Sequence, residues 1–198
     1  MASWRPRTGA AGTFLWRAGL ARSMSLIAVA GLPGTGTTTL CRILAPRLQL
    51  PHVYAGHLFR QMAKEHSMDV NQFGEYAENH PEVDTELDRR LIDVARRGGA
   101  ILEGRMCAWH VREAHAAALK VLLEAPEEVR ARRVADREGA GDWMQVLAQN
   151  RHREASEAKR YREIYGFDPN DPRHYDLVID SSDKTPERIA GLVVAALS

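Results

Sequence analysis

Residues 31–39, Gly-Leu-Pro-Gly-Thr-Gly-Thr-Thr-Thr, have the composition and spacing of a phosphate-binding loop. Glycines lack Cβ, so consecutive backbone N–H groups can turn toward one anion, and a helix starting here points its positive end at the same place. Gly31 and Gly36 match the glycines of the pattern G-x-x-x-x-G-K-[ST], and Thr38 falls where a hydroxyl binds Mg²⁺. The residues predicted to hold phosphate groups are Gly31, Gly34, Thr35, Gly36, Thr37, Thr38 and Thr39.

Thr37 departs from this pattern, because the position normally holds a lysine. Without that cation, the charge on a transferred phosphoryl group has to be neutralised by other residues. Two alternatives to an active site follow from the departure: an ordinary Gly/Pro turn, or a module that binds a nucleotide without turning it over. The preceding apolar run, 26–30, and the hydroxyl of Thr38 favour a phosphate site.

Arginines elsewhere in the chain could supply the missing charge. Arg153, Glu157 and Arg160 stand at i, i+4 and i+7, so they share one face of a helix. Such a face can be a solvated, salt-bridged surface or a clamp for phosphate oxygens. A second group, Arg130, Arg133 and Arg137, precedes a Gly-Ala-Gly hinge at 139–141 that would let both groups close over a nucleotide. We expect four arginines to act in phosphoryl transfer: Arg133, Arg137, Arg153 and Arg160.

The elements that must position these residues alternate between strand and helix. We expect strands at 26–30, 50–54, 100–105, 119–125 and 175–180. We expect helices at 37–48, from a glycine turn at 55–60 through 61–80, and at 82–97, 111–118, 127–137, 143–165 and from 185 onward. Pro46 should kink the first helix or end it early. The segment 61–80 is polar without a strong core face, as expected for a mobile flap. The alternation predicts an α/β protein in which helices cover both faces of a five-stranded parallel sheet.

The composition is that of one domain. The chain has 198 residues, 44% hydrophobic content and a net charge of +1, so nothing global indicates nucleic acid or a membrane surface. Cys41 and Cys107 lack metal-ligand spacing and are expected to be packing residues. Residues 1–23 carry four arginines and no acid, which indicates a leader or a disordered extension before a domain at 24–198.

Several ordered motifs together resemble the cytidylate kinase family, particularly its archaeal type. They are the loop at 31–39, Val-Tyr-Ala-Gly-His-Leu-Phe-Arg at 53–60, Leu-Glu-Gly-Arg at 102–105 and Lys-Arg-Tyr-Arg-Glu-Ile-Tyr-Gly at 159–166. The resemblance implies a P-loop kinase fold with a flap for the nucleoside monophosphate at about 56–97 and a lid at about 133–160. It implies ATP with Mg²⁺ as donor and CMP or dCMP as acceptor.

The resemblance also implies roles for single residues. Arg60 would hold the acceptor monophosphate, Arg105 would lie at the acceptor site, and Glu157 would help to read the cytosine. Bacterial relatives carry an aspartate for the base after the Gly-Arg pair, but this chain has Met106. Base selection therefore has Glu157, Asp84 and Asp88 as candidates, since a carboxylate accepts from the exocyclic amine that uracil lacks.

Glu103 ends the third predicted strand beside the phosphate loop. A carboxylate there can order Mg²⁺ together with Thr38, or it can simply pair with Arg105. Both interpretations stay open in the sequence.

Other functions also remain open. The same fold could phosphorylate AMP, dTMP, UMP or shikimate, or the chain could be a non-catalytic nucleotide-binding module. We expect a cytoplasmic monomer whose partners are small nucleotides, with neither nucleic acid nor membrane as a partner. Import into an organelle through residues 1–23 is the alternative location.

Overall fold

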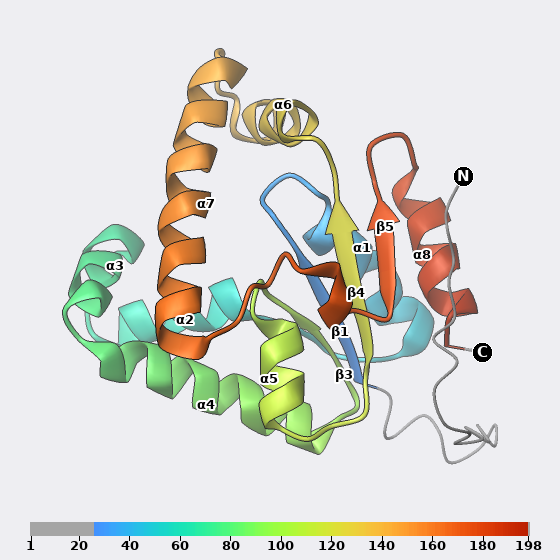
Figure 1. Cartoon of the computed structure of the whole chain (residues 1–198), viewed down its shortest axis with the longest axis horizontal. Coiled ribbons are helices and arrows are strands. Elements are labelled where there is room, and N and C mark those ends of the chain that lie inside the picture. Colours follow the sequence, from blue (N-terminus) through green and yellow to red (C-terminus); the bar gives the residue numbers. More distant parts are fainter. Residues whose placement is uncertain (1–25, 198) are drawn as a thin grey trace.

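The computed structural model describes residues 26–197, without the side chains at 70, 71, 75, 78, 156 and 160. Five strands form one sheet: β1 (Leu26–Gly31), β2 (His52–Tyr54), β3 (Ala100–Glu103), β4 (Leu119–Glu124) and β5 (Leu177–Asp180). Their order is β2-β3-β1-β4-β5, and every pairing is parallel (Figure 1). The prediction of a five-stranded parallel sheet is confirmed. The arginine-rich residues 1–23, predicted to be a leader or extension, lie outside the described residues.

Each strand is followed by one or more helices. They are α1 (Thr37–Leu48), α2 (Ala55–Glu65), α3 (Val70–Glu78), α4 (Pro81–Arg97), α5 (Cys107–Glu113), α6 (Glu127–Glu138), α7 (Trp143–Tyr165) and α8 (Pro186–Ala195), with a 3₁₀ turn at Pro172–His174. Among the described residues, no helix is long and apolar enough to cross a membrane.

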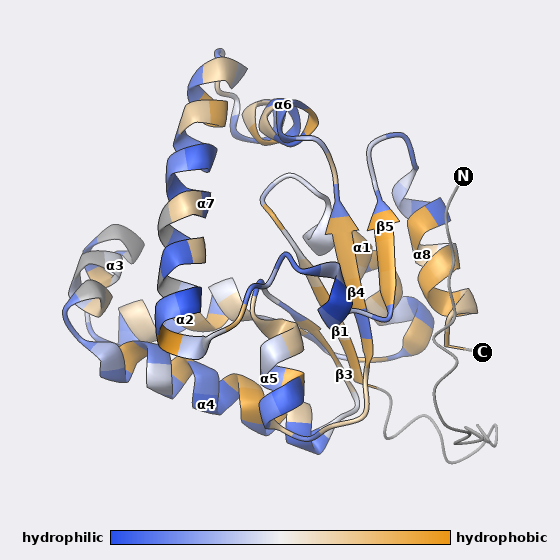
Figure 2. Cartoon of the chain, viewed as in Figure 1, coloured by the Kyte–Doolittle hydropathy of each residue, from blue (hydrophilic) through white to orange (hydrophobic). Residues whose placement is uncertain are grey.

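The central strand β1 is buried because helices cover both of its faces. Ile27 and Val29 pack with the apolar sides of α1 and α8, whereas Ala28 and Ala30 pack with α4 and α5. Adjacent residues of a strand point to opposite faces, so an unbroken apolar run suits a strand covered on both sides. Figure 2 shows β4 and β5 largely hydrophobic, whereas α6 and α7 mix hydrophobic and hydrophilic residues.

Two expectations about where helices end differ from the structure. Pro46 does not end α1, which continues to Leu48; the proline falls in the last turn, where only one helical hydrogen bond is lost. The helix expected at 111–118 instead occupies Cys107–Glu113, and His115 just beyond it has φ 51°. Left-handed backbone at that position stops the helix.

The region 61–80 is not one polar helix. It contains the end of α2 and all of α3, and Met62, Phe73 and Ala77 form a small hydrophobic cluster with Val83 of α4. The expectation that this region lacks a strong core face was wrong, because the apolar residues of two short helices meet only after the chain turns between them. The cluster makes α2, α3 and α4 one packed unit beside the sheet.

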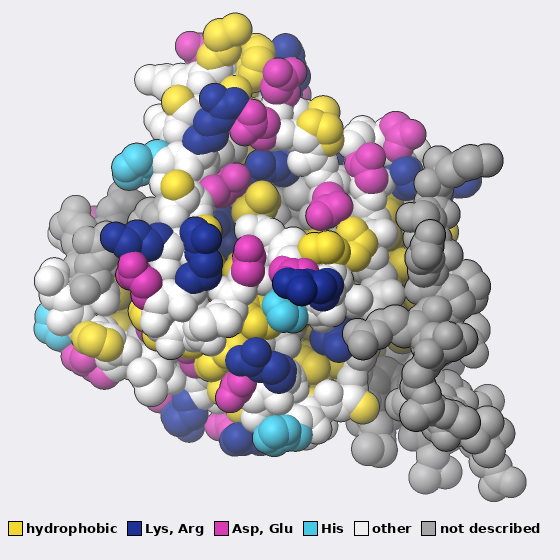
Figure 3. All heavy atoms as spheres, in the orientation of Figure 1, with side chains coloured by type: hydrophobic (Ala, Val, Ile, Leu, Met, Phe, Trp, Pro, Cys, Tyr) yellow, Lys and Arg dark blue, Asp and Glu magenta, His cyan; other side chains and the backbone are white. Residues whose placement is uncertain are grey.

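Helix α7 lies apart from the sheet, as Figure 1 shows. Its first turns pack on α6 through Val146, which joins a cluster with Ala131, Val134 and Ala135. Its last turn contacts α5, where the Tyr165 and Trp109 ring centroids are 4.7 Å apart. On the face shown in Figure 3, basic and acidic side chains are interspersed, in line with the net charge of +1.

Candidate active site

A cavity of about 820 Å³ opens at the carboxyl edge of the sheet. Residues 31–40 form its floor, and α6 and α7 contribute arginines to its wall. The predicted site residues that line it are Gly31, Gly34, Thr35, Gly36, Thr37, Thr38, Thr39, Arg60, Glu103, Arg105, Arg133, Arg137 and Arg153. Ligands of open parallel sheets bind at this edge, so the topology gathers the predicted residues where a ligand is expected.

The phosphate loop has the backbone that its glycines predict. Gly34 and Gly36 have φ values of 87° and 94°, in the left-handed region that glycine adopts readily. A Cβ on Gly34 would lie 2.4 Å from the carbonyl oxygen of Arg130, so the loop also packs too closely on α6 for a side chain. Gly36 is the N-cap of α1, which therefore begins at the loop and directs its free N–H groups there.

Glu103 is 3% exposed and lies directly beside the loop. Its Oε1 accepts hydrogen bonds from Thr37 Oγ1 at 2.8 Å and from Thr38 Oγ1 at 2.6 Å. Its Oε2 is 2.7 Å from His52 Nε2. Of the two interpretations of Glu103, pairing with Arg105 is not observed, because Arg105 contacts Glu157; the magnesium interpretation stays a prediction.

The donor set suits a hard cation. The Thr38 hydroxyl and the Glu103 carboxylate are oxygen ligands, which Mg²⁺ prefers. Cys41 is buried in the core, as expected of a packing residue, and its thiol, His52 and Glu103 also have ligand atoms within 4.8 Å of one another. Burial raises the pKa of the Cys41 thiol, and a protonated thiol is a poor magnesium ligand. The oxygen donors are therefore the ones that fit.

The side-chain N–H groups of Arg133 donate hydrogen bonds to other parts of the protein. Its guanidinium donates to the carbonyl oxygens of Gly34, Ser181 and Ser182 at 3.4, 2.8 and 3.1 Å. It thereby joins the phosphate loop to the segment after β5. Arg137 is exposed next to Glu138 and reaches the cavity from the same helix.

Arg130 has a structural place that the sequence did not reveal. It is 5% exposed, and its guanidinium donates to the carbonyl oxygens of Ala125 and Pro33 and to the carboxylate of Glu154. The residue therefore links the loop and α6 to α7. Because its donors are used internally, Arg130 is not a free lid arginine as the sequence pattern suggested.

Glu157 lies between Arg153 and Arg105. The sequence predicted Arg153 and Arg160 on either side of it. Arg153 Nε donates to Glu157 Oε1 at 2.8 Å, and Arg105 contacts Glu157 Oε2. Arg105 is largely buried, and this burial lowers the pKa of its guanidinium. The clamp predicted from sequence consists of Arg153 and Arg160. The side chain of Arg160 lies outside the described residues, so only Arg153 of this clamp can be placed.

Arg60 and Tyr54 also line the cavity. The Arg60 guanidinium carbon lies 5.4 Å from the centre of the Tyr54 ring, within the range of a cation–π contact. Sequence reasoning did not single out Tyr54, His52 or Lys184, which also lines the cavity. The alternation of His52 and Tyr54 in one strand was the available signal for the first two.

Asp84 and Asp88 lie away from the phosphate loop. Both line a separate cavity of about 530 Å³ between α4, α5 and α7. Asp88 accepts a hydrogen bond from Tyr165 at 2.7 Å and lies 2.8 Å from His110 Nε2. Burial, with the contact to Asp88, raises the pKa of Tyr165. Asp88 thus ties three helices together, which leaves Glu157 as the base-reading candidate nearest the loop cavity.

Comparisons with known proteins point to one family. Residues 26–183 match the model of the cytidylate kinase-like family. The cytidylate kinase of Pyrococcus abyssi is 47% identical over 172 residues, covering 87% of this chain and 93% of that protein. The cytidylate kinase of Thermococcus sibiricus is 48% identical over 178 residues, covering 90% of each chain.

Solved structures support the fold. A shikimate kinase from Acinetobacter baumannii, solved with shikimate, matches with a TM-score of 0.59 and 15% identity, covering 89% of this chain and 94% of that one. An uncharacterised protein from Eubacterium ventriosum matches with a TM-score of 0.68 and 14% identity, covering 87% and 98%. At such identities the likeness concerns the fold alone.

Proposed function

The chain belongs to the cytidylate kinase-like family, and we propose that it transfers the γ-phosphoryl group of ATP to CMP or dCMP, giving ADP with CDP or dCDP. The observation that carries the proposal is the single cavity joining the phosphate loop to Arg60, Arg105 and Arg153. Phosphoryl transfer needs positioning and charge neutralisation more than covalent chemistry by the protein, and this cavity offers both. One chain supplies all these residues, so we propose a monomeric enzyme.

The donor nucleotide would occupy the loop side of the cavity. Backbone N–H groups of 31–39 and the start of α1 would bind its phosphates. Thr38 and Glu103 would hold Mg²⁺, which when bound neutralises charge on the phosphate oxygens. Arg133 and Arg137, next to the loop on α6, would add positive charge in place of the absent loop lysine.

The acceptor would occupy the opposite side. Arg60 would hold its phosphate, and Arg105 and Arg153 would orient it toward the donor. Glu157 would accept a hydrogen bond from the amine of cytosine, and the two arginines that hold it would fix its orientation. We propose that residues 56–97 act as the flap and 133–160 as the lid, and that Arg160 acts in phosphoryl transfer.

A panel of acceptors tests this function. The chain from Met24 is incubated with ATP and CMP, dCMP, UMP, AMP, dTMP or shikimate, with Mg²⁺ or with EDTA. We expect Mg²⁺-dependent turnover with CMP or dCMP as the best acceptor. Turnover of a different acceptor would overturn the base assignment. ATP binding without turnover of any acceptor would instead support the non-catalytic module that Thr37 suggests.

A further inference from the structure

His52 has no part in the function described so far, yet it touches the most buried acid of the site. It begins β2, which pairs with β3 so that His52 lies opposite Ile101 and Tyr54 lies opposite Glu103. Residues two apart in a strand point to the same face of the sheet. The imidazole therefore lies on the same side as Glu103 and reaches its Oε2 with Nε2 at 2.7 Å.

The two oxygens of Glu103 have different partners. Oε1 accepts from Thr37 and Thr38, and Oε2 faces His52. A glutamate carboxylate rotates easily about its last side-chain bond, so contacts on one oxygen alone would leave its plane poorly fixed. Because His52 occupies Oε2, the carboxylate plane is fixed and Oε1 stays with the two hydroxyls.

The imidazole is itself held in place. Its ring stacks on Tyr54, with centroids 6.3 Å apart and an interplanar angle of 24°. Tyr54 in turn lies under the Arg60 guanidinium, and its ring packs on Gly56, where a Cβ would lie 2.8 Å away. A continuous row of contacts therefore runs from the acceptor arginine through β2 to the phosphate loop.

We propose that His52 is a positioning residue of the phosphoryl-transfer site, which orients Glu103 so that the carboxylate meets the hydroxyls of Thr37 and Thr38. The proposal rests on the proposed function and extends it to β2. The phosphate loop has no lysine to order it against the ligand, so its side-chain order depends on these contacts with Glu103. Losing the imidazole would leave a buried carboxylate with one unpaired oxygen, which is costly.

The decisive experiment compares His52→Leu with His52→Gln. Leucine fills space without a polar atom, whereas the glutamine amide can still reach Glu103. We expect His52→Leu to lower kcat about 10- to 100-fold, as for other residues that orient a metal ligand, with KM for CMP changed less than about threefold. His52→Gln should stay within about threefold of the wild type, since it keeps the donor.

A second comparison separates positioning from packing. In the Glu103→Gln background, His52→Leu should change kcat less than about twofold, because a residue that acts through Glu103 has nothing left to orient. Thermal unfolding of each variant checks the fold, and His52→Asn, whose amide is too short to reach Glu103, replaces His52→Leu if the latter does not fold. Equal losses in the leucine and glutamine variants, or losses that multiply in the double variant, would overturn the proposal.

ATP binding supplies a readout that does not need turnover. Calorimetry should show a larger Kd for ATP in His52→Leu than in the wild type when Mg²⁺ is present, and equal Kd values without Mg²⁺. If the wild type phosphorylates no nucleotide, the proposed function fails, whereas the His52 inference is decided by this binding series alone. Equal affinity of the wild type and His52→Leu for ATP with Mg²⁺ would contradict it.

Discussion

At the scale of single residues, the site depends on a few oxygen atoms around Glu103. The Thr38→Ala variant loses a hydroxyl that donates a hydrogen bond to this carboxylate. The same hydroxyl is a proposed magnesium ligand. We expect kcat to fall about 100-fold, as for loss of other preorganised polar groups, with little change in the unfolding temperature, because the hydroxyl contributes little to the core. Thr38→Ser should retain most of the rate. Steady-state kinetics over a range of Mg²⁺ concentrations measures the effect, and unchanged turnover in Thr38→Ala would remove Thr38 from the metal site.

Arg153 and Arg151 form a matched pair on α7. Arg153 lines the cavity with a side chain that is 66% exposed, whereas Arg151 pairs with Glu127 outside it. If Arg153 neutralises charge in phosphoryl transfer, Arg153→Ala should lose about 10³-fold in kcat/KM, in the range of an arginine finger. Arg151→Ala should stay near the wild-type rate. Losses of only a few-fold in both variants would mean that this helix face is merely solvated.

Single residues could be predicted from the sequence only where their partners are close in the chain. The loop 31–39 folds from adjacent residues, so its glycines and Thr38 could be assigned from spacing. His52 could not be assigned, because its partner Glu103 is 51 residues away and only the pairing of β2 with β3 brings them together. Likewise, nothing local distinguishes the buried Arg130 from the exposed arginines around it.

At the scale of elements, the phosphate loop and α6 are fitted to each other. Gly34→Ala would place a Cβ 2.4 Å from the Arg130 carbonyl oxygen and would force a left-handed φ of 87° on a residue with a side chain. We expect the variant to lower both the unfolding temperature and the affinity for ATP, since the loop must move off α6. Gly191→Ala is the control, because this α8 glycine has no atom within 4 Å of the added carbon. Calorimetric ATP binding that is equal in the two variants would contradict this fit.

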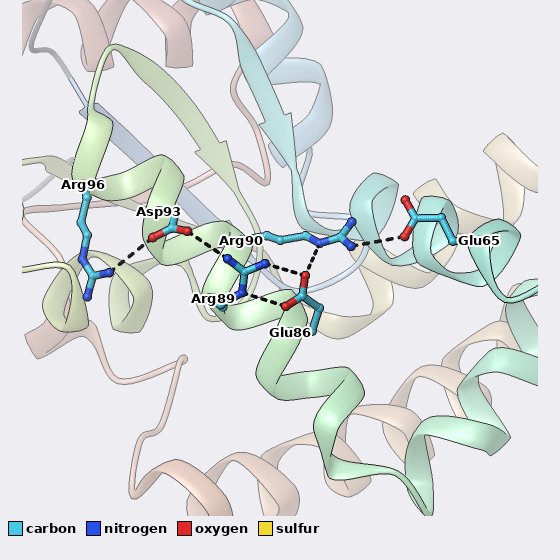
Figure 4. A network of polar contacts seen from close by, with 6 residues as sticks. All are labelled: Glu65, Glu86, Arg89, Arg90, Asp93 and Arg96. Atoms are coloured by element: carbon cyan, nitrogen blue, oxygen red, sulfur yellow. Dashed lines mark hydrogen bonds and ion pairs between the residues drawn. The ribbon is translucent and has the colours of Figure 1, made fainter.

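Helix α4 carries two kinds of polar network. Figure 4 shows the exposed one, in which Glu86 binds Arg89 and Arg90, and Arg90 continues to Glu65 of α2. The hydrogen bonds from Arg89 and Arg90 lower the pKa of Glu86 to about 2. This pKa lies below the ordinary 4.5 of a glutamate. The contribution of these contacts to the stability of the folded protein is therefore complete above about pH 4.5 and is lost as the pH falls through about 2. Exposed pairs contribute little and are screened by salt.

The other network, around Asp88, is half-buried and should matter more. Asp88→Ala leaves the Tyr165 hydroxyl without its acceptor and the His110 ring without its contact. We expect a loss of about 1–3 kcal/mol in the free energy of unfolding at pH 7, the cost of unpaired buried polar groups. Glu86→Ala should cost clearly less. Denaturant unfolding of both variants compares them, and a larger loss in Glu86→Ala would contradict the assignment of Asp88 as the tie between α4, α5 and α7.

Element prediction from periodicity had a clear limit. The helix α7 was predicted with its observed bounds, because Gly-Asp precedes it and Gly166 ends it with a φ of 58°. The division of 61–80 into two helices was not predicted, since the cluster around Phe73 forms only when α2, α3 and α4 pack together. The early start of α5 was missed for a similar reason: Cys107, Ala108 and Val111 become a buried face only against the sheet.

At the scale of the whole molecule, the sheet brings the residues proposed for the donor and for the acceptor to one edge. The order β2-β3-β1-β4-β5 sets the acid at the end of β3 next to the loop after β1. Strand alternation was enough to predict a parallel sheet, because parallel strands need helical crossovers. The choice of acceptor could not be predicted from the same pattern, since Glu157 obtains its two arginine partners from separate parts of the chain.

The central claim is that this cavity, without a loop lysine, moves a phosphoryl group between nucleotides. The most direct measurement uses ATP that carries a radioactive label in its γ-phosphate. The protein is incubated with this ATP, CMP and Mg²⁺, and the products are separated by chromatography. We predict that the label appears in the β-phosphate of CDP and that EDTA abolishes the transfer. If the protein binds ATP but no label appears in any nucleoside diphosphate, the claim is contradicted. Thr37 in place of the lysine would then indicate a module that binds nucleotide without turnover.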